Sequence, residues 1–447
     1  NWKGSVICLD VKHENYQFTS GFRRKHGQDV FMWSPSKKGK QSHCYNPLDF
    51  ISREPWEQIG DLKVLTSILI PEKKSVSDFW ESEARSFFVG LAIYVIDNDE
   101  MPSTIGAINR LMGTEEELGD ICRHIVKTYR KKVPTAMVKT LMAFANKAAK
   151  ERSGVKSTLS NSLNSWDDPS VDSATSKSDF DIKALRKKPV SIYVGITPGQ
   201  IEAQAPLIRI FFEQVIASLS IELPTGEEKH QVLLLLDEFH MLGKMNVMTK
   251  AFTLLAGYST RVLAVTQGIT FLDEAYGRNI RNGILSCCAH QIFYSANDLD
   301  TANYMSDSCG QTTVEAINSS TNSSTRQKTQ TKSYIGRPLL SKDEAKHLPN
   351  TQSVIFVESS NPIKATKFDY RDEKAFQSRL LPPPPVPDLD FKDESIPKFN
   401  IPNPANANKE TIDPNQINFL NDATTEEDDL LPDIFNDDEK EDDDLLP

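Results

Sequence analysis

A run of five apolar residues, Val232 to Leu236, leads directly into the acidic pair Asp237 and Glu238. A short unbroken apolar run is typical of a parallel strand that is buried on both faces of a sheet. Open α/β sheets bind their ligands beside the carboxyl ends of such strands. The acidic pair is therefore predicted to lie at a ligand-binding edge, although acids after a strand also occur as helix caps or on a solvated rim.

A second strand-like run, Arg261 to Thr266, ends at Gln267. If the two strands are neighbours, the acidic pair and the carboxamide face one crevice. In a nucleotide-hydrolysing site the first acid holds Mg²⁺ through water, the second accepts a proton from the attacking water, and the amide orients the γ-phosphate. The pattern thus favours Asp237 as the Mg²⁺ ligand, with Glu238 and Gln267 as catalytic residues.

The chain up to about residue 380 alternates strand patterns with helical ones. Further strands are predicted at 5–10, 30–33, 191–196, 289–295 and 353–358. This alternation predicts an α/β fold, a parallel sheet of at least six strands with helices on both faces. Between about 76 and 188 the spacing of apolar residues is helical throughout, which predicts an all-α insertion. Residues 311–334 are rich in Ser, Thr, Asn and Gln, and we expect a mobile surface loop there.

Asp10 ends the first of these strands, and the charged residues Lys12 and Glu14 follow it. Charges just beyond a strand end fit either the ligand edge of the sheet or a solvated turn. We take Asp10, Lys12 and Glu14 as candidate cofactor-binding residues.

Charge divides the chain unevenly. Residues 381–447 carry 19 acidic and 4 basic side chains, a net charge of −15, whereas residues 1–380 carry a net charge of +4. The predicted organisation is a first sheet part at 1–75, the helical insertion at 76–188, a second sheet part at 189–380 and a Pro-rich, acidic, mostly disordered tail at 381–447.

The tail ends in two acidic repeats that both close with Leu-Leu-Pro. Their apolar residues are Leu430, Leu431 and Pro432 in the first repeat, and Leu445, Leu446 and Pro447 in the second. A solubilising end and a short partner-docking motif both fit such a tail.

The six cysteines show no paired spacing, and we expect reduced core thiols in a cytosolic environment. No apolar run reaches the roughly 18 residues of a membrane span, and no signal peptide is visible. With 38% hydrophobic residues, most of the chain is expected to be soluble and globular. The sequence Asn1-Trp2-Lys3-Gly4 leads straight into a strand, so we expect a fragment of a longer protein.

Short segments spread over residues 1 to 380 occur in an order that resembles one known family. They are Leu9–Glu14, Asn46–Asp49, Phe79–Glu81, Ala84-Arg85, Ser178–Asp181, Asp237–Phe239, Ala256–Tyr258 with Gln267, Tyr276-Gly277, Asp300–Ala302 and Arg337–Leu340. Leu9–Glu14 is similar to the family's Asp-Pro-Lys-Gly-Glu segment. Together these segments resemble the coupling-protein ATPases of type IV secretion and bacterial conjugation.

The resemblance implies a RecA-like P-loop NTPase fold that uses ATP and Mg²⁺. It makes Asp237 and Glu238 the Walker B pair, Gln267 the third-motif amide, and 76–188 the family's all-α domain, which faces the cytoplasm and is linked to substrate engagement. Such proteins are hexameric motors anchored in the bacterial inner membrane. They deliver DNA–relaxase complexes or effector proteins to the secretion channel. The implied partners are further copies, other secretion components, and adaptor, relaxase or effector proteins, with DNA, protein or both as cargo.

Two departures from the family pattern limit the expected activity. No G-x-x-x-x-G-K-[S/T] segment occurs in the chain. In the family this phosphate loop and the membrane helices lie upstream of the Asp10 strand, so we expect no ATP hydrolysis by the fragment alone. Val11 and His13 also replace the Pro and Gly of the family segment.

An arginine finger is not assigned by the sequence, because Ala256 stands where some relatives carry arginine. Arg261, Arg278 and Arg281 are the candidates.

Three functions compete at this stage. The first is the ATP-driven motor that the acidic pair and Gln267 favour. The second is a non-catalytic recruitment platform that binds adaptors or effectors through the helical insertion and the acidic tail. The third is a septal-type DNA translocase, which shares the RecA-like core but lacks a large helical insertion at this point.

Overall fold

The computed structural model describes residues 2–35, 40–72, 78–129, 134–321, 328–391 and 399. These residues belong to one compact unit, Asn1–Phe399. The Leu-Leu-Pro repeats predicted as docking motifs lie outside the described residues.

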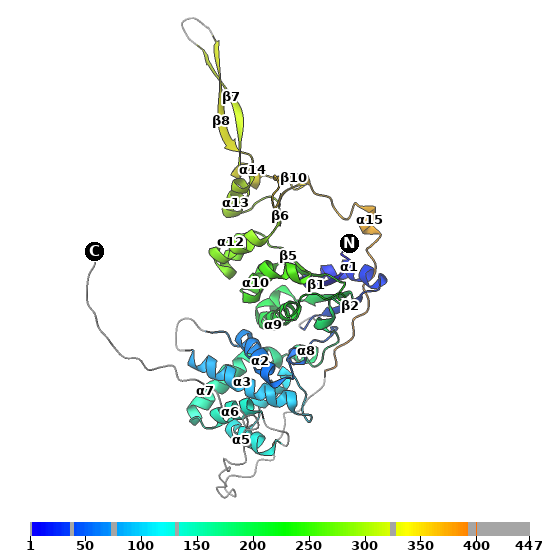
Figure 1. Cartoon of the computed structure of the whole chain (residues 1–447), viewed down its shortest axis with the longest axis vertical. Coiled ribbons are helices and arrows are strands. Elements are labelled where there is room, and N and C mark those ends of the chain that lie inside the picture. The colour runs from blue at the N-terminus through cyan, green and yellow to red at the C-terminus, as the bar shows by residue number, and fades with distance from the viewer. Residues whose placement is uncertain are drawn as a thin grey trace, which may run out of the picture. The chain divides into compact units, whose positions relative to one another are not determined.

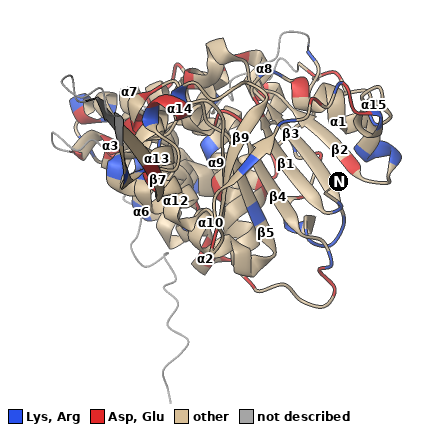
Figure 2. Cartoon of the chain, turned by 90° about the horizontal axis from the view of Figure 1, so that it is seen from above, with Lys and Arg blue, Asp and Glu red and all other residues tan. Residues whose placement is uncertain are grey.

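A parallel sheet forms the centre of this unit (Figure 1). In the described residues it has five strands, β1 (Ser5–Asp10), β2 (Asp29–Trp33), β3 (Val190–Gly195), β4 (Val232–Leu236) and β5 (Thr260–Ala264). Their order is β2-β3-β1-β4-β5, with every pair parallel. All residues of β1 and β3 are buried, which explains their unbroken apolar runs. Figure 2 shows β1, β3 and β4 almost free of charge, and Asp10 is their one ionisable acid or base of the Asp, Glu, Lys and Arg type.

Helices cover both faces of the sheet, as predicted. They are α1 (Glu14–Lys25), α9 (Ile201–Ser220), α10 (Asn246–Leu254), α11 (Thr270–Tyr276) and α12 (Arg278–Cys287). On one face Tyr16 of α1 joins a cluster with Val6, Cys8, Val30, Met32 and Tyr193. On the other face Trp33 of β2 packs against Phe211 of α9, with 5.2 Å between ring centroids. The doubly covered α/β sheet is therefore confirmed.

The described residues between β2 and β3 are mainly helical. Its helices are α2 (Pro55–Leu69), α3 (Phe79–Asp97), α4 (Ile105–Met112), α5 (Leu118–Thr128), α6 (Thr135–Ala145), α7 (Ala149–Leu163) and α8 (Pro169–Ala174). Helix α3 is central, and its Phe87 stacks on Phe144 of α6 at 3.7 Å between centroids. The described residues between 78 and 188 contain no strand, so the all-α insertion is confirmed. Its exact boundaries stay a prediction, since helix already begins at α2.

The prediction of a single parallel sheet of at least six strands was wrong. The strands β6 (His290–Phe293) and β9 (Gln352–Val357) form a separate antiparallel sheet with β10 (Ile363–Thr366) in the described residues. The five-residue connection from β9 to β10 is too short for a parallel crossover and forces a hairpin. Helices α13 (Leu299–Cys309) and α14 (Lys342–Lys346) cover one face of this sheet, with Ala302, Met305 and Ala345 in its core.

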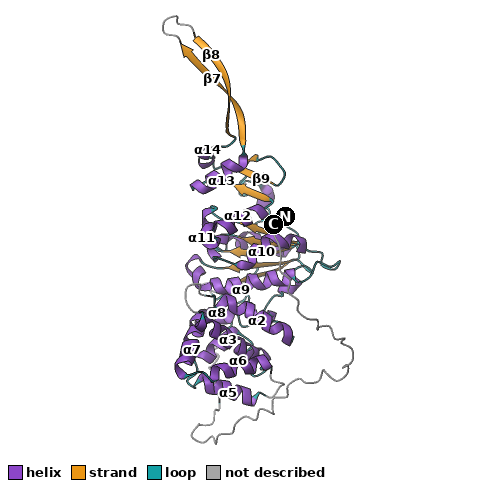
Figure 3. Ribbon diagram, turned by 60° about the vertical axis from the view of Figure 1, so that its left-hand side comes forward, coloured by secondary structure: helices purple, strands orange, loops and turns teal. Residues whose placement is uncertain are grey.

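The surface loop predicted at 311–334 was also wrong. Strands β7 (Gln311–Thr321) and β8 (Lys328–Pro338) pair over eleven positions as a hairpin that extends from α13 and α14 (Figure 3). Val314 lies opposite Ile335, and Glu315 pairs with Lys332 at 2.7 Å. β-Branched threonines favour strands even where apolar content is low, and a rule based on polarity misses this.

After β10 the chain forms the short helix α15 (Lys374–Gln377) and then an extended segment, residues 381–391, that stays on the body of the molecule (Figure 1). All six cysteines are free, with Cys8, Cys44 and Cys122 buried and Cys287 exposed. None of the helices in the described residues combines the length and apolar character that crossing a membrane requires.

Candidate active site at the carboxyl edge of the sheet

The predicted acids and amide meet at one edge of the parallel sheet. Strands β1, β4 and β5 are neighbours, with Leu9 beside Leu236 and Leu236 beside Ala264. Asp10, Asp237 and Gln267 therefore follow adjacent strand ends. The side-chain amide of Asn15 spans two of them, since its Nδ2 lies 3.3 Å from Asp10 Oδ1 and 3.5 Å from Asp237 Oδ2.

Asp10 is held by the first turn of α1. Its Oδ1 accepts from the Asn15 backbone N–H at 3.2 Å, and its Oδ2 accepts from that of Tyr16 at 2.8 Å. The side chain is buried, and burial raises the pKa of Asp10, while these hydrogen bonds oppose the rise. Burial and the charges of Asp10 and Asp237 also raise the pKa of the Cys8 thiol of β1. Negative charge is thus concentrated here.

Glu238 follows Asp237 in the chain and contacts Gln267. The Gln267 Nε2 is 3.3 Å from both carboxylate oxygens of Glu238. Glu238 adopts the left-handed conformation, with φ of 52° and ψ of 44°. Non-glycine residues seldom adopt this conformation, and such backbone strain is concentrated at functional sites. The backbone before and after Asp237 and Glu238 is fixed to the residue that follows β5. Leu236 O accepts from Val265 N–H at 2.9 Å, and Phe239 N–H donates to Val265 O at 3.0 Å.

His240 completes the surroundings of Glu238. Its Nδ1 lies 3.8 Å from Glu238 Oε2 and 3.3 Å from Thr266 Oγ1, and its ring packs on Phe271. The sequence analysis did not identify Asn15, His240 or Thr266. Asn15 was accessible to it, since the first turn of a helix after a strand-end acid is where capping donors lie.

The loop from β1 to α1 carries the other two predicted ligands. Lys12 and Glu14 are exposed, and Glu14 is the first residue of α1. His13, which replaces the family's glycine, has a φ of 59°. Glycine reaches this left-handed region without strain, so the loop keeps the shape that glycine favours. The His13 ring packs so closely on Gly195 that a Cβ there would clash.

The three arginine candidates have different surroundings. Arg261 lies near the start of β5, at the far end from Gln267, and donates to the backbone oxygen of Ala256 at 2.9 Å. Arg281 is buried and forms a two-armed ion pair with Asp273, at 2.9 and 3.2 Å. Arg278 is exposed, with a weaker contact to Asp300 at 3.3 Å. Arg261 and Arg278 are therefore both exposed to other molecules, whereas Arg281 is not.

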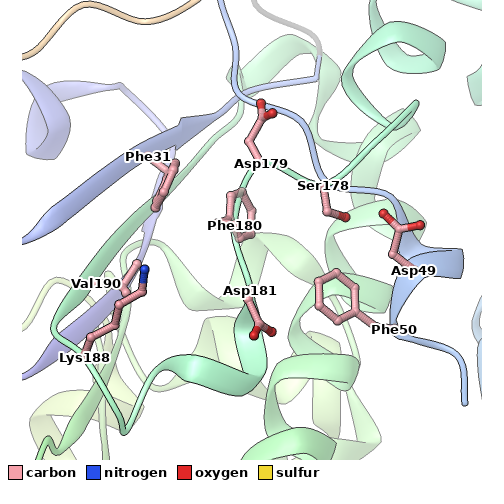
Figure 4. Close-up of a pocket in the computed structure, with 9 residues that line it drawn as sticks. All are labelled: Phe31, Asp49, Phe50, Ser178, Asp179, Phe180, Asp181, Lys188 and Val190. Atoms are coloured by element: carbon pink, nitrogen blue, oxygen red, sulfur yellow. The ribbon is translucent and has the colours of Figure 1, made fainter.

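A cavity of about 430 Å³ lies away from this edge, where the chain returns from the helical insertion to β3 (Figure 4). Phe31, Phe50 and Phe180 form its aromatic lining, with Asp181 and Lys188 among its polar residues. Phe180 is fixed by Phe31 and by stacking on Tyr45, so the cavity belongs to the junction between insertion and sheet.

Solved structures with this arrangement define the class of fold. The bacterial conjugative coupling protein TrwBdeltaN70 aligns with a TM-score of 0.59 at 18% identity, covering 82% of this chain and 78% of that one. TrwB in complex with the ATP analogue ADPNP aligns with a TM-score of 0.59 at 16% identity, over 89% of this chain and 81% of that one. The fold is a RecA-like P-loop NTPase sheet with an all-α insertion.

The family follows from the sequence. Residues 1–388 match the family described as Type IV secretory system Conjugative DNA transfer. The chain is 32% identical over 376 residues to the protein VirD4 of Agrobacterium fabrum, which covers 83% of this chain and 56% of that protein. It is 26% identical over 421 residues to the conjugal transfer protein TraG of Escherichia coli, covering 86% and 66%. The chain belongs to this family, the type IV coupling proteins, and spans about half the length of the VirD4 proteins it matches.

Proposed function

We propose that this chain supplies the acidic half of the ATP-hydrolysing site of a type IV secretion coupling protein, whose turnover drives or gates substrate transfer. The observation that carries the proposal is the Glu238–Gln267 pair beside the Asp10–Asn15–Asp237 group on adjacent strand ends. The names of the relatives, conjugal transfer proteins and a coupling protein solved with ADPNP or with ADP and Mg²⁺, support it.

The donor set fits Mg²⁺. Asp10 and Asp237 offer carboxylate oxygens that one amide already draws together, and hard oxygen ligands with retained waters are what Mg²⁺ prefers. A bound cation would offset the like charges that share this edge. Asp237, at the end of β4, is the residue we assign to hold Mg²⁺ through water, with Lys12 and Glu14 at the rim.

The roles at the reacting end follow from the contacts of Glu238. Mg²⁺ with ATP, when bound, supplies an electrophilic γ-phosphorus with its charge partly neutralised. Glu238 accepts the proton of the attacking water. Gln267 holds that carboxylate in place through its Nε2, and its Oε1 can accept a hydrogen bond from the attacking water. The phosphate-binding loop motif does not occur in this sequence, so no residue named here is assigned to cradle the triphosphate.

The full-length protein is proposed to act in the inner membrane as a homo-oligomer, in the hexameric form expected of the family. It would work with the other secretion components and receive adaptors, relaxases or effectors. Membership over residues 1–388 favours this role over a septal-type translocase. Recruitment of partners by the acidic tail and the helical insertion is compatible with the motor, because a coupling protein has to bind its substrate as well as hydrolyse ATP.

Substrate transfer by donor cells tests the proposal. A strain lacking the protein is complemented with full-length wild type, with Glu238→Gln, or with the exposed-site control Glu274→Gln. We expect transfer to be lost only with Glu238→Gln, at equal protein levels. Transfer at the wild-type frequency with Glu238→Gln would refute the proposal that ATP hydrolysis at this site drives or gates transfer.

A further inference from the structure

Residues 381–391, called here the C-terminal strap, lie against three separate parts of the protein. Near α1 the carbonyl oxygens of Leu381 and Pro382 come so close to Gly21 that no side chain fits there. Beside β2 the strap pairs with the chain at residues 40–42, where Leu389 N–H donates to Lys40 O at 2.6 Å. The strap therefore continues the folded body rather than beginning the tail.

The far end of the strap reaches the helical insertion. Ser173 of α8 donates from its Oγ to Asp390 O at 2.8 Å. Leu389 is buried with Cys44 and Ala174. The strap thus connects α1, which begins at the candidate active site, with the insertion.

Its composition suits this course. Prolines at 382–385 and 387 favour an extended backbone with no internal hydrogen bonds and fewer N–H groups that need partners. The free carbonyl groups then accept from the body, as Pro387 O does from Ser42 N–H at 3.1 Å.

Tyr16 joins the strap to the active site. Its hydroxyl donates to Pro384 O at 2.7 Å, while its backbone N–H donates to Asp10 Oδ2 at 2.8 Å. The side chain is 3% exposed, and the strap's Val386 packs on the same cluster. Tyr16 therefore contacts both the strap and the Asp10 carboxylate of the proposed Mg²⁺ site.

We propose that Tyr16 is a positioning residue through which the docked C-terminal strap holds Asp10 in place for Mg-nucleotide binding. This rests on the proposed function for its effect on nucleotide.

Amide hydrogen exchange on this chain tests the mechanical part without nucleotide. Two truncations form a matched pair, one ending at Leu380 and lacking the strap, the other ending at Phe391 and keeping it. We expect the amides of Asn15 and Tyr16 to exchange about tenfold faster only when the strap is missing, since protection reports local opening. Equal protection in the two truncations would overturn the coupling.

If the shorter truncation does not fold, the same exchange measurement on the Tyr16→Phe variant tests the coupling. This variant removes only the hydroxyl bond to Pro384, while Tyr193→Phe is the control that removes a hydroxyl bond in the same cluster, to Thr19 at 2.6 Å. We expect about fivefold faster exchange of the Asn15 and Tyr16 amides in Tyr16→Phe and wild-type exchange in the control. The reverse order, or no difference, would contradict the proposal.

Steady-state kinetics of the full-length protein distinguish a loss of Asp10 positioning from a general loss of structure around Tyr16. Tyr16→Phe is expected to raise KM for Mg-ATP about fivefold with kcat unchanged, because Asp10 is assigned to binding. An unchanged KM, or a fall in kcat alone, would overturn the positioning role. If the full-length wild type does not hydrolyse ATP, the proposed function fails, and the exchange experiment still decides whether the strap is coupled to Asp10.

Discussion

The amide nitrogen of Gln267 lies 3.3 Å from both carboxylate oxygens of Glu238, across the ends of two adjacent parallel strands. The two residues are 29 positions apart in sequence and meet only because β4 and β5 are neighbours. An amide nitrogen that contacts both carboxylate oxygens fixes the orientation of the carboxylate. The Gln267 amide oxygen is then still able to accept a hydrogen bond. This geometry makes Gln267 the partner of the candidate base.

Gln267→Ala in the full-length protein should lower kcat for ATP by about a hundredfold, since it removes a preorganised group next to the base. KM should change little, because Gln267 is not assigned to ground-state binding. Steady-state ATPase assays measure both. Gln231→Ala, an exposed residue just before β4, is the control. A kcat within twofold of wild type would exclude a catalytic role.

The buried Asp10 predicts a pH dependence of stability. Burial raises its pKa in the folded state, so folding favours its protonated form, and its contribution to stability falls as pH rises through that pKa. Wild type should therefore gain stability relative to Asp10→Asn as pH falls from about 7 to about 4. Urea unfolding of both chains across this range measures the difference. A difference that is constant with pH, or that shrinks in acid, would contradict the burial argument.

Alanine variants of Arg281 and Arg278 should distinguish an arginine that stabilises the fold from one that acts at an interface. Arg281→Ala leaves Asp273 without its ion-pair partner and is expected to lower the free energy of unfolding by about 3 kcal/mol. Arg278→Ala should cost less than about 1 kcal/mol, because its pair with Asp300 is exposed. If Arg278 is the finger, its variant loses ATP turnover while unfolding normally. Equal stability losses in both variants would refute this division.

Deletion of residues 392–447 should remove adaptor or effector binding if the acidic tail recruits partners. Pull-downs from cell extract with the full-length protein and the deletion variant measure recovery of secretion partners. The cut is placed at 392 because a deletion from 381 would also remove the C-terminal strap and its contacts with Tyr16 and Ser173. Unchanged recovery of partners would leave the tail as a solvated end.

The main sheet was predictable from sequence because its strands are short and largely apolar, and the runs of β1 and β4 lead into acidic residues. The convergence of Asp237, Glu238 and Gln267 was predicted from parallel strands sharing one edge, and in the structure Gln267 contacts Glu238. Their roles in catalysis stay predictions. The contacts of His240 depend on loop geometry that no spacing rule gives.

The errors came from elements whose pairing is decided away from the local pattern. Strands β6 and β9 resemble β4 in length, yet the short hairpin to β10 sets them antiparallel in another sheet. The hairpin β7–β8 was hidden by its polar residues, although its threonines favour extended backbone. The C-terminal strap was grouped with the Pro-rich, acidic tail predicted at 381–447, whereas its carbonyl groups contact Gly21 and Tyr16.

The most direct test of the central claim is ATP hydrolysis by the full-length protein with Glu238→Gln. The change keeps the size and the hydrogen-bonding reach of the side chain but removes its ability to take a proton. Turnover should fall by about 10²-fold or more, while binding of a fluorescent ATP analogue with Mg²⁺ stays at the wild-type level. Turnover at the wild-type rate would show that Glu238 is not the base and that this edge of the sheet is not the hydrolytic site.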